Sequence, residues 1–190
     1  LRQSDELFQL IWMGYNWYEP FSIFRTLRVN IDQFMVWDFG GVLAVKGIEG
    51  GGMAQFKNFW SSHVRFDIIG EKRINSYLRG GPSMLLPGNI NLRGEITTDS
   101  RKKLVFEPGF GFEIGFDNSS KSYEYSVEME YKPINSLNLS LEPEYSKEKS
   151  TLQYVTQHCD GPDEDRYIFA SIDQSVLSLS LRANLTLSPN

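Results

Sequence analysis

Carboxylates in the middle of the chain are the side chains whose spacing most suggests chemistry. Those expected to share one face of extended strands are Glu95, Glu107, Glu113, Glu124, Glu128, Glu130, Glu142 and Glu144. Rows of Asp or Glu attract cations in pores, so one hypothesis is a cation-attracting channel wall. The alternative is an ordinary solvated lumen surface on which Arg93 and Arg182 pair with some of the carboxylates. A glycosidase pair also uses two carboxylates, but the separation it requires cannot be known from the sequence.

The other reactive side chains are few and isolated. His63 and His158 lie outside any nucleophile motif, and the single cysteine, Cys159, can form no internal disulfide. Two histidines and one cysteine are a poor basis for a Cys/His metal site, so we expect no catalytic residue, no metal and no other cofactor. The triplet Gly50–Gly52 lacks the lysine of a phosphate-binding loop and is predicted to be a flexible turn.

Composition narrows the class of protein. The net charge is -5, the pI is near 5.1 and there is no basic stripe, so nucleic acid is not expected as a partner. Apolar residues make up 41% of the chain, yet the mean hydropathy is -0.34. No apolar run approaches the roughly 18 residues of a membrane helix, whereas a strand of a membrane barrel needs only about 9 to 11 alternating residues.

Alternation of apolar and polar residues is the main signal along the chain. In Leu104–Phe116 a ladder of Leu, Phe, Pro and Ile alternates with small or acidic residues and one Val, which predicts a strand with two different faces. The same pattern marks further segments: Leu27–Asp32, Trp60–Ile68, Ile90–Ile96, Tyr123–Tyr131, Leu137–Glu142 and Leu177–Leu187. A first strand near Phe8–Tyr18 is expected but its phase is not clear, and the pattern blurs through Phe34–Phe39.

Short polar segments separate these runs and predict hairpins. They are Asp99–Lys102, Asp117–Lys121 and Lys132–Ser136. If Lys132–Ser136 is a periplasmic turn, parity places Asp99–Lys103 and Ser188–Asn190 on the same side and Asp117–Lys121 and the acidic segment Asp160–Arg166 outside. We therefore predict an all-β fold: an antiparallel up-and-down transmembrane β-barrel, present here as an incomplete fragment of about eight strands.

A soluble β-sandwich would also alternate, so the polar face has to discriminate between the two folds. A soluble sheet usually presents Lys and Thr to water, whereas this one offers Gly, Ser, Asn, Glu and single Arg residues. The aromatic residues expected at strand ends, where interfacial girdles lie in membrane barrels, are Tyr15, Trp17, Trp60, Tyr123, Tyr131 and Tyr145. The residues predicted to face the lumen are Arg93, Glu95, Glu107, Glu113, Glu124, Glu128, Glu130, Glu142 and Arg182.

Two motifs, Arg79-Gly80-Gly81-Pro82 and Thr98-Asp99-Ser100-Arg101-Lys102, resemble a bacterial family of outer-membrane β-barrel domains of unknown function. Other matching stretches are Ala54–Asn58, Leu152–Val155, Arg166–Phe169 and Asp173-Gln174. Full-length members join an N-terminal carbohydrate-binding-like domain of the family nine type to the barrel. The resemblance implies that residues 1–190 are part of one barrel domain, without that N-terminal domain and the closing strands.

The matching motifs supply four candidate loop residues, Arg79, Asp99, Arg101 and Asp173. For Arg79, an inward-folded loop whose guanidinium pairs with lumen carboxylates and a simple tight turn both remain open. We expect a bacterial outer-membrane protein, in contact with lipid and with carbohydrate as a possible ligand, that acts as a pore, anchor or docking barrel. A glycan-directed hydrolase with its active groups in the lumen or the absent domain, and a soluble β-rich binding protein, are the alternatives.

Overall fold

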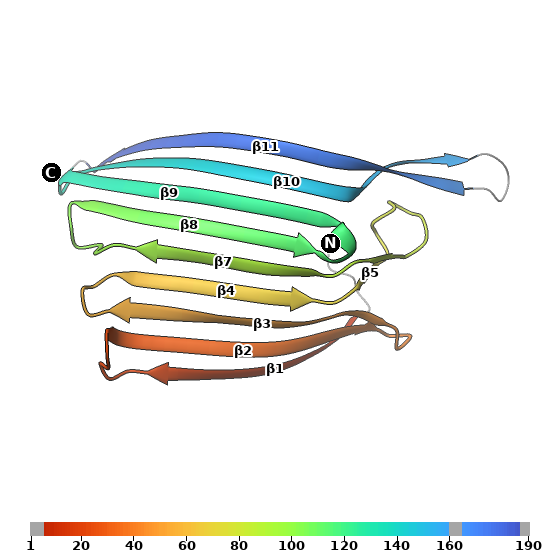
Figure 1. The fold of residues 1–190 in the computed structure, drawn as a ribbon, viewed down its shortest axis with the longest axis horizontal. Coiled ribbons are helices and arrows are strands. Elements are labelled where there is room, and N and C mark those ends of the chain that lie inside the picture. Colours follow the sequence, from red (N-terminus) through yellow and green to blue (C-terminus); the bar gives the residue numbers. More distant parts are fainter. Residues whose placement is uncertain (1–5, 160–164, 187–190) are drawn as a thin grey trace.

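Antiparallel strands account for nearly all of the chain in the computed structural model, which describes residues 6–159 and 165–186 (Figure 1). The strands are β1 (Glu6–Trp17), β2 (Phe24–Asp38), β3 (Leu43–Phe56), β4 (Ser61–Ile69), β5 (Lys72–Ile74), β6 (Met84–Leu86), β7 (Asn89–Thr97), β8 (Leu104–Gly115), β9 (Ser120–Ile134), β10 (Leu137–Cys159) and β11 (Asp165–Leu185). A single 3-10 turn, η1 (Phe116–Asn118), joins β8 to β9. The all-β prediction is therefore confirmed.

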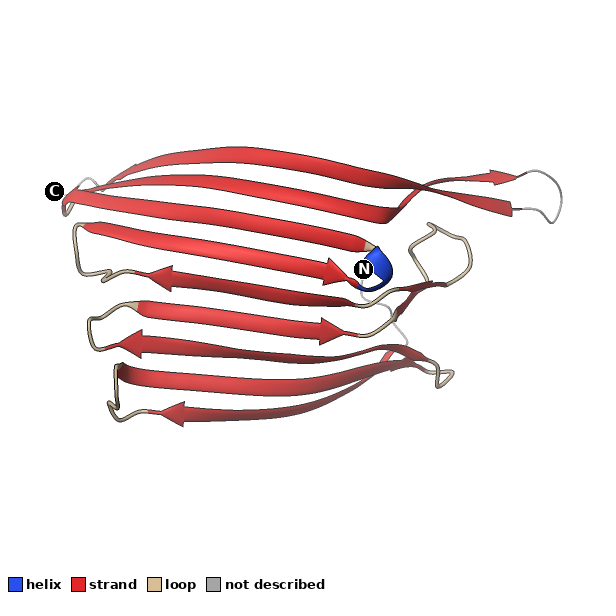
Figure 2. Cartoon of the chain, in the orientation of Figure 1, coloured by secondary structure: helices blue, strands red, loops and turns tan. Residues whose placement is uncertain are grey.

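Nine of the strands form one sheet in the order β1-β2-β3-β4-β7-β8-β9-β10-β11, and β5 pairs only with β6 (Figure 2). Each strand of the large sheet lies beside its neighbour in sequence except at β4 and β7, which flank the β5–β6 insertion. In the described residues β1 and β11 are opposite edges that do not pair with each other, so the sheet is open. Nine strands exceed the eight expected.

The turns follow the predicted parity. The turns between β7 and β8 and between β9 and β10 lie at one end of the sheet, and η1 lies at the other (Figure 1). The predicted turns were too wide, because Lys121 belongs to β9 and only Asn135 and Ser136 separate β9 from β10. Most of the acidic segment Asp160–Arg166, together with Ser188–Asn190, lies outside the described residues.

The triplet Gly50–Gly52 corrects the sequence analysis, because it lies inside β3 and not in a flexible turn. Close neighbours account for two of the three glycines. A Cβ on Gly50 would lie 2.7 Å from the Phe66 ring, and one on Gly51 would lie 2.8 Å from the Val64 carbonyl oxygen. The absent side chains let β3 pack between β2 and β4, and they also removed the apolar signal that marks a strand.

Both faces can be followed across the whole sheet through the pairing register. One face, here called the apolar face, carries a nine-residue row that crosses every strand: Tyr15, Val29, Gly52, Val64, Gly94, Phe110, Tyr125, Tyr145 and Leu177. The other, the polar face, carries the alternating Glu, Asn, Ser and Arg residues. Because the side-chain period of a strand is two, a single register fixes both faces at once.

A conventional core is missing from the described part of the chain. Of its apolar side chains only Ala54, Leu78 and Val105 are buried. Leu78 lies in the insertion between β5 and β6, which contacts the long β10–β11 hairpin where the Tyr77 hydroxyl donates a hydrogen bond to the Leu152 carbonyl oxygen. The sheet is thus a single layer whose apolar face is exposed.

The register also explains why the alternation fades near the start of the chain. Toward the η1 end of β1 and β2, the polar face itself becomes apolar, with Phe8, Leu10, Phe34 and Val36 on it. The Phe8 and Phe34 rings stack with centroids 6.5 Å apart. Both faces are apolar there, so no period of two remains in the sequence.

Candidate functional site on the polar face

An acidic row crosses the polar face from edge to edge. Reading across the sheet, the paired positions are Trp12, Asp32, Glu49, Asp67, Asn91, Glu113, Ser122, Glu148 and Gln174. Five carboxylates from β2, β3, β4, β8 and β10 therefore stand in one line perpendicular to the strands. Asp32, Glu49 and Asp67 are on adjacent strands, which lie only about 4.8 Å apart, whereas one polar residue separates each of the other neighbouring carboxylates.

Each carboxylate of the acidic row has a polar partner. Among the charged and amide contacts, Arg65 Nη2 lies 3.3 Å from Glu49 Oε2, and Asn91 Nδ2 donates to Asp67 Oδ2 at 2.8 Å. The other hydrogen bonds are Asn30 to Asp32 (3.4 Å), Ser120 to Glu113 (3.3 Å) and Gln174 to Glu148 (3.2 Å). These donors hold the carboxylates in place and satisfy part of their hydrogen-bonding capacity.

An arginine pair lies directly beside the acidic row. Arg65 on β4 is opposite Arg93 on β7, and the next two positions of the same cross-strand row are Gly111 and Glu124. A cavity of about 290 Å³ lies over this part of the sheet. Gly109 and Gly111 form part of its lining. Because glycine has no side chain, backbone atoms form this part of the cavity floor. Positive and negative groups thus face each other across a glycine floor.

A second cavity of about 430 Å³ extends from the first toward β1. Its polar lining includes Arg28, Gln55 and Thr97, and His63 and Glu95 border both cavities. His63 Nδ1 lies 3.7 Å from Glu95 Oε1, with both side chains about half exposed. The two cavities together form a polar trough, defined by His63, Arg65, Arg93, Glu95 and Glu124. Such a set of donors and acceptors can hydrogen-bond a hydroxylated or charged ligand.

All nine predicted lumen residues lie on the polar face: Arg93, Glu95, Glu107, Glu113, Glu124, Glu128, Glu130, Glu142 and Arg182. Glu107 and Glu128 are directly opposite each other on β8 and β9, and Thr97 Oγ1 donates to Glu107 at 2.9 Å. The expected arginine partners are not used. In the described ranges neither Arg93 nor Arg182 forms an ion pair, and Glu130 pairs with Lys132 at 2.8 Å.

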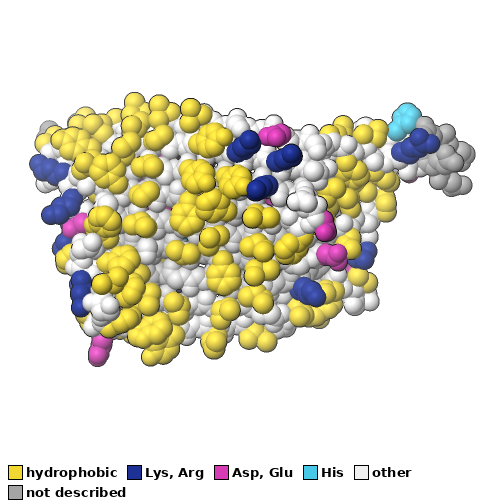
Figure 3. Space-filling view, in the orientation of Figure 1, with side chains coloured by type: hydrophobic (Ala, Val, Ile, Leu, Met, Phe, Trp, Pro, Cys, Tyr) yellow, Lys and Arg dark blue, Asp and Glu magenta, His cyan; other side chains and the backbone are white. Residues whose placement is uncertain are grey.

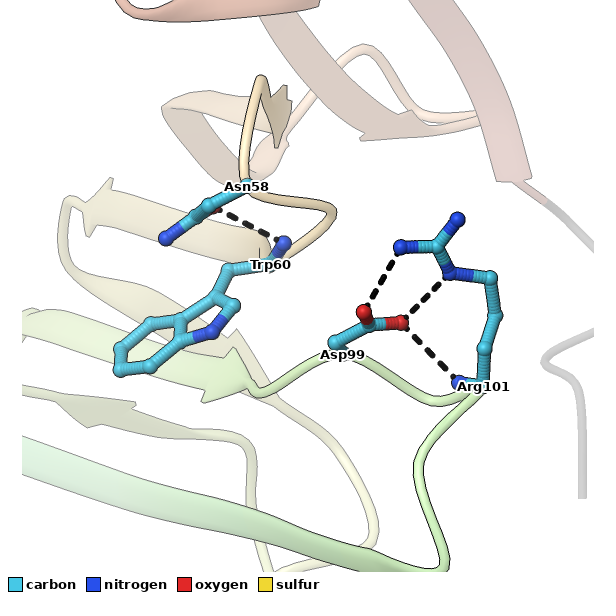
Figure 4. Close-up of polar contacts among 4 residues, drawn as sticks. All are labelled: Asn58, Trp60, Asp99 and Arg101. Carbon is cyan, nitrogen blue, oxygen red and sulfur yellow. Dashed lines mark hydrogen bonds and ion pairs between the residues drawn. The ribbon is translucent and has the colours of Figure 1, made fainter.

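Asp99 and Arg101 form a closed pair within the turn between β7 and β8 (Figure 4). Arg101 donates from Nε and Nη2 to the two oxygens of the buried Asp99 at 2.8 and 2.7 Å, and its backbone N–H donates at 3.1 Å. These hydrogen bonds lower the Asp99 pKa to about 2 and raise the Arg101 pKa. The Arg101 guanidinium also lies 3.3 Å from the centroid of the Phe59 ring. Both groups therefore stabilise the turns and have little capacity left for a ligand.

The remaining two loop candidates are separate from the trough. The Arg79 N–H donates to the Ser76 carbonyl at 3.1 Å, and the Arg79 side chain is exposed and forms no ion pair in the part of the chain that the structure describes. This geometry is the tight turn and not the inward-folded loop. Asp173, expected in a loop, lies within β11 on the apolar face, opposite Lys149.

Sequence reasoning missed several members of the polar face. The residues not proposed as candidates are Arg28, Asp32, Glu49, Arg65, Asp67 and Glu148. Asp32, Arg65 and Asp67 carried a usable signal, since they occupy the polar positions of alternating runs. Glu49 did not, because it is surrounded by the glycines of β3. Only the register shows that residues so far apart in the chain form one row.

No helix among residues 6–159 and 165–186 has the length and apolarity to cross a membrane. Within the same ranges, no three His, Cys, Asp or Glu side chains are grouped as ligands of a metal ion.

Comparison with known proteins identifies the chain at the level of its family model. Residues 1–190 match the model described as "Domain of unknown function (DUF5916)" over their whole length. No curated protein and no solved structure matches the chain. Any statement about function must therefore come from the sheet itself.

Proposed function

The chain belongs to the DUF5916 family of domains of unknown function, and we propose that it forms part of the wall of a bacterial outer-membrane β-barrel. In this proposal the apolar face contacts lipid and the polar face lines a water-filled lumen. The barrel serves as a pore, anchor or docking site for a polar ligand, and the donors and acceptors of the trough can hydrogen-bond the hydroxyl groups of a carbohydrate. The observation that carries the proposal is an uncovered apolar band that crosses the strands obliquely.

The apolar face has no covering layer in the described chain. On β11, Leu177, Leu179 and Leu181 are 80%, 69% and 77% exposed. Contiguous exposed apolar surface on this scale is rare in soluble monomers and is costly in water at about 25 cal/mol per Å². Hydrocarbon removes that cost without a second sheet, so lipid contact accounts for the single-layer architecture.

The borders of the band are tilted relative to the hydrogen-bonding direction. The cross-strand row that contains Gly52 on β3 and Tyr145 on β10 serves as the reference. Toward the η1 end, the band on β10 ends at Tyr145, because Lys147 follows on the same face. On β3 the band continues four residues further, to Ile48, and Lys46 follows. The offset of four residues is about 13 Å, over five strand spacings of about 24 Å in total. The strands would therefore incline by about 30° to the normal of the band, a little less than the roughly 35–45° of membrane barrels.

The opposite border shifts in the same direction. On β2 this border is at Leu27, two residues from the reference row, and on β10 it is at Leu137, eight residues from that row. The height of the band follows from β10, where Tyr145 to Leu137 spans eight residue steps, or about 27 Å along the strand. Corrected for the tilt, the height is about 23 Å, against about 25 Å for the apolar band of outer-membrane barrels.

Aromatic residues gather along that opposite border. The border holds Trp17 on β1, which is 37% exposed, Trp60 in the turn before β4, which is 42% exposed, and Tyr131 on β9, which is 47% exposed. Trp and Tyr favour the level of lipid headgroups, because their rings are apolar at one end and polar at the other.

A membrane sheet also needs paired edges, so the proposal requires further strands beside β1 and β11.

Heat-modifiable migration tests the proposal. The full-length protein, extracted in detergent, is run on a gel with and without boiling, and a folded barrel is expected to migrate differently in the unboiled sample. The matched samples are a membrane fraction washed with urea and a soluble fraction from the same cells. Recovery in the soluble fraction, with equal mobility before and after boiling, would reject the membrane wall.

A further inference from the structure

Three lysines form a cluster on the apolar face at its η1 end. Lys121 lies at the start of β9, and Lys147 and Lys149 lie in the part of β10 that pairs with it. All three side chains are exposed. Figure 3 shows a group of basic side chains beside one acidic group, where the hydrophobic surface over β9, β10 and β11 ends. The grouping is notable in a chain whose net charge is -5.

The positive charge of this lysine cluster is balanced only in part by the described chain. Lys149 is directly opposite Lys121, an arrangement of like charges that destabilises a sheet. Asp173 is opposite Lys149 on the other side. Even so, no carboxylate among the described residues lies within 4.0 Å of any of the three amines. With Asp173 as the one acidic cross-strand partner of three lysines in the described sheet, the cluster keeps a net positive charge.

The place of the cluster relative to the apolar band decides which anion fits. Lys147 is opposite Tyr123, and the next residue of β10 on the same face toward the middle of the band is Tyr145. The Lys121 amine lies 5.3 Å from the centroid of the Tyr123 ring. Aromatic rings followed by cations are the sequence of groups expected between hydrocarbon and the headgroup layer.

We propose that Lys121, Lys147 and Lys149 bind the phosphate of a membrane lipid headgroup whose acyl chains lie along the apolar face of β9–β11. This inference rests on the proposed membrane location. Ammonium groups act as compact point charges toward phosphate oxygens, and three of them within two adjacent strands can surround one headgroup. The lipid phosphate would add to Asp173 in offsetting the repulsion between Lys149 and Lys121.

The test compares three ligands on the full-length protein in a zwitterionic detergent. Thermal unfolding is followed with dihexanoyl phosphatidic acid, with dihexanoyl phosphatidylcholine and with inorganic phosphate. A ligand that binds only the folded state raises the melting temperature. We expect a concentration-dependent rise with phosphatidic acid and none with the other two.

Two triple variants of equal charge separate the site from the overall charge. Replacement of Lys121, Lys147 and Lys149 by Gln is expected to weaken phosphatidic acid binding by about fivefold per lysine, or ~100-fold in total. The control replaces Lys57, Lys102 and Lys103, in turns at the other end of the sheet, and should keep the wild-type shift. The single variant Lys149→Gln serves if the triple variant does not fold, with a loss of about fivefold.

The lipid site would be overturned if phosphatidic acid raised the melting temperature equally in both triple variants. It would also be overturned if inorganic phosphate raised the melting temperature as much as phosphatidic acid does. Loss of the shift in the cluster variant alone would support it. A protein that shows heat-modifiable migration but no preference for phosphatidic acid would refute only the lipid site. A protein recovered in the soluble fraction would remove the proposed function as well.

Discussion

Replacement of Leu181 by arginine tests whether the apolar face of the sheet contacts hydrocarbon. Leu181 lies on β11, midway between Leu177 and Leu185, which pair with Tyr145 and Leu137, the two ends of the apolar band on β10. Each end is four residues away, or about 13 Å along the strand, which a tilt of about 30° reduces to about 11 Å of depth. The substitution therefore places a guanidinium near the middle of the proposed hydrocarbon layer.

The expected cost is about 2–4 kcal/mol of unfolding free energy for an arginine near the bilayer midplane. In water the same change at a side chain that is 77% exposed should stay within about 0.5 kcal/mol. The matched control is Ser180→Arg, the preceding residue, which faces Glu142 on the polar face. An arginine there gains an opposite charge and should leave stability nearly unchanged.

Urea unfolding of the protein folded in lipid vesicles, followed by tryptophan fluorescence, measures both variants. We expect a lower midpoint for Leu181→Arg and an unchanged one for Ser180→Arg. If Leu181→Arg unfolds within about 0.5 kcal/mol of the wild type, the apolar face does not contact hydrocarbon. A loss of the same size in both variants would show that the cost of an arginine does not depend on the face, and the reasoning from faces would be wrong.

Three further outcomes are expected. Gly51→Leu should lower the urea midpoint by the equivalent of about 1–3 kcal/mol, because its Cβ would meet a backbone carbonyl at 2.8 Å, whereas Gly52→Ala, with its nearest atom at 3.5 Å, should be nearly neutral. Asp99 has a pKa lowered from 3.8 to about 2, so its ionised form stabilises the turn above about pH 4 and this stabilisation is lost as the pH falls toward 2. The melting temperature of Asp99→Asn should therefore lie below that of the wild type at pH 6, and the difference should disappear near pH 2; a constant difference would argue against the ion pair. In planar bilayers Asp67→Asn should shift the reversal potential toward lower cation preference, whereas Asp117→Asn, in the η1 turn, should not; equal shifts would contradict a role for the acidic row.

The extent of correct prediction varies along the chain for identifiable reasons. The strand from Leu104 was predicted almost to its last residue, because apolar and polar neighbours alternate without interruption. β3 was missed entirely, because glycines occupy the positions where apolar side chains would have marked the strand. β1 was predicted without a phase, since apolar residues occupy both of its faces near Leu10 and Ile11.

The site was predicted in part for a similar reason. Every proposed lumen residue lies on the polar face, because alternation assigns a face to each residue once a strand is recognised. Alternation does not assign neighbours across strands. The arginine pair of Arg65 and Arg93 and the ion pair between Arg65 and Glu49 join residues from three strands, and the sequence gives no offset between those strands.

Sequence alone determined that this is an antiparallel sheet with one apolar and one polar face, because a period of two is a local property of the backbone. The tertiary structure decided which residues share a cross-strand row. It thereby set the line of five carboxylates, the glycine-floored trough and the three lysines at the border of the apolar face. Register fixes these features, since a shift of two residues in one strand would keep every face and change every neighbour.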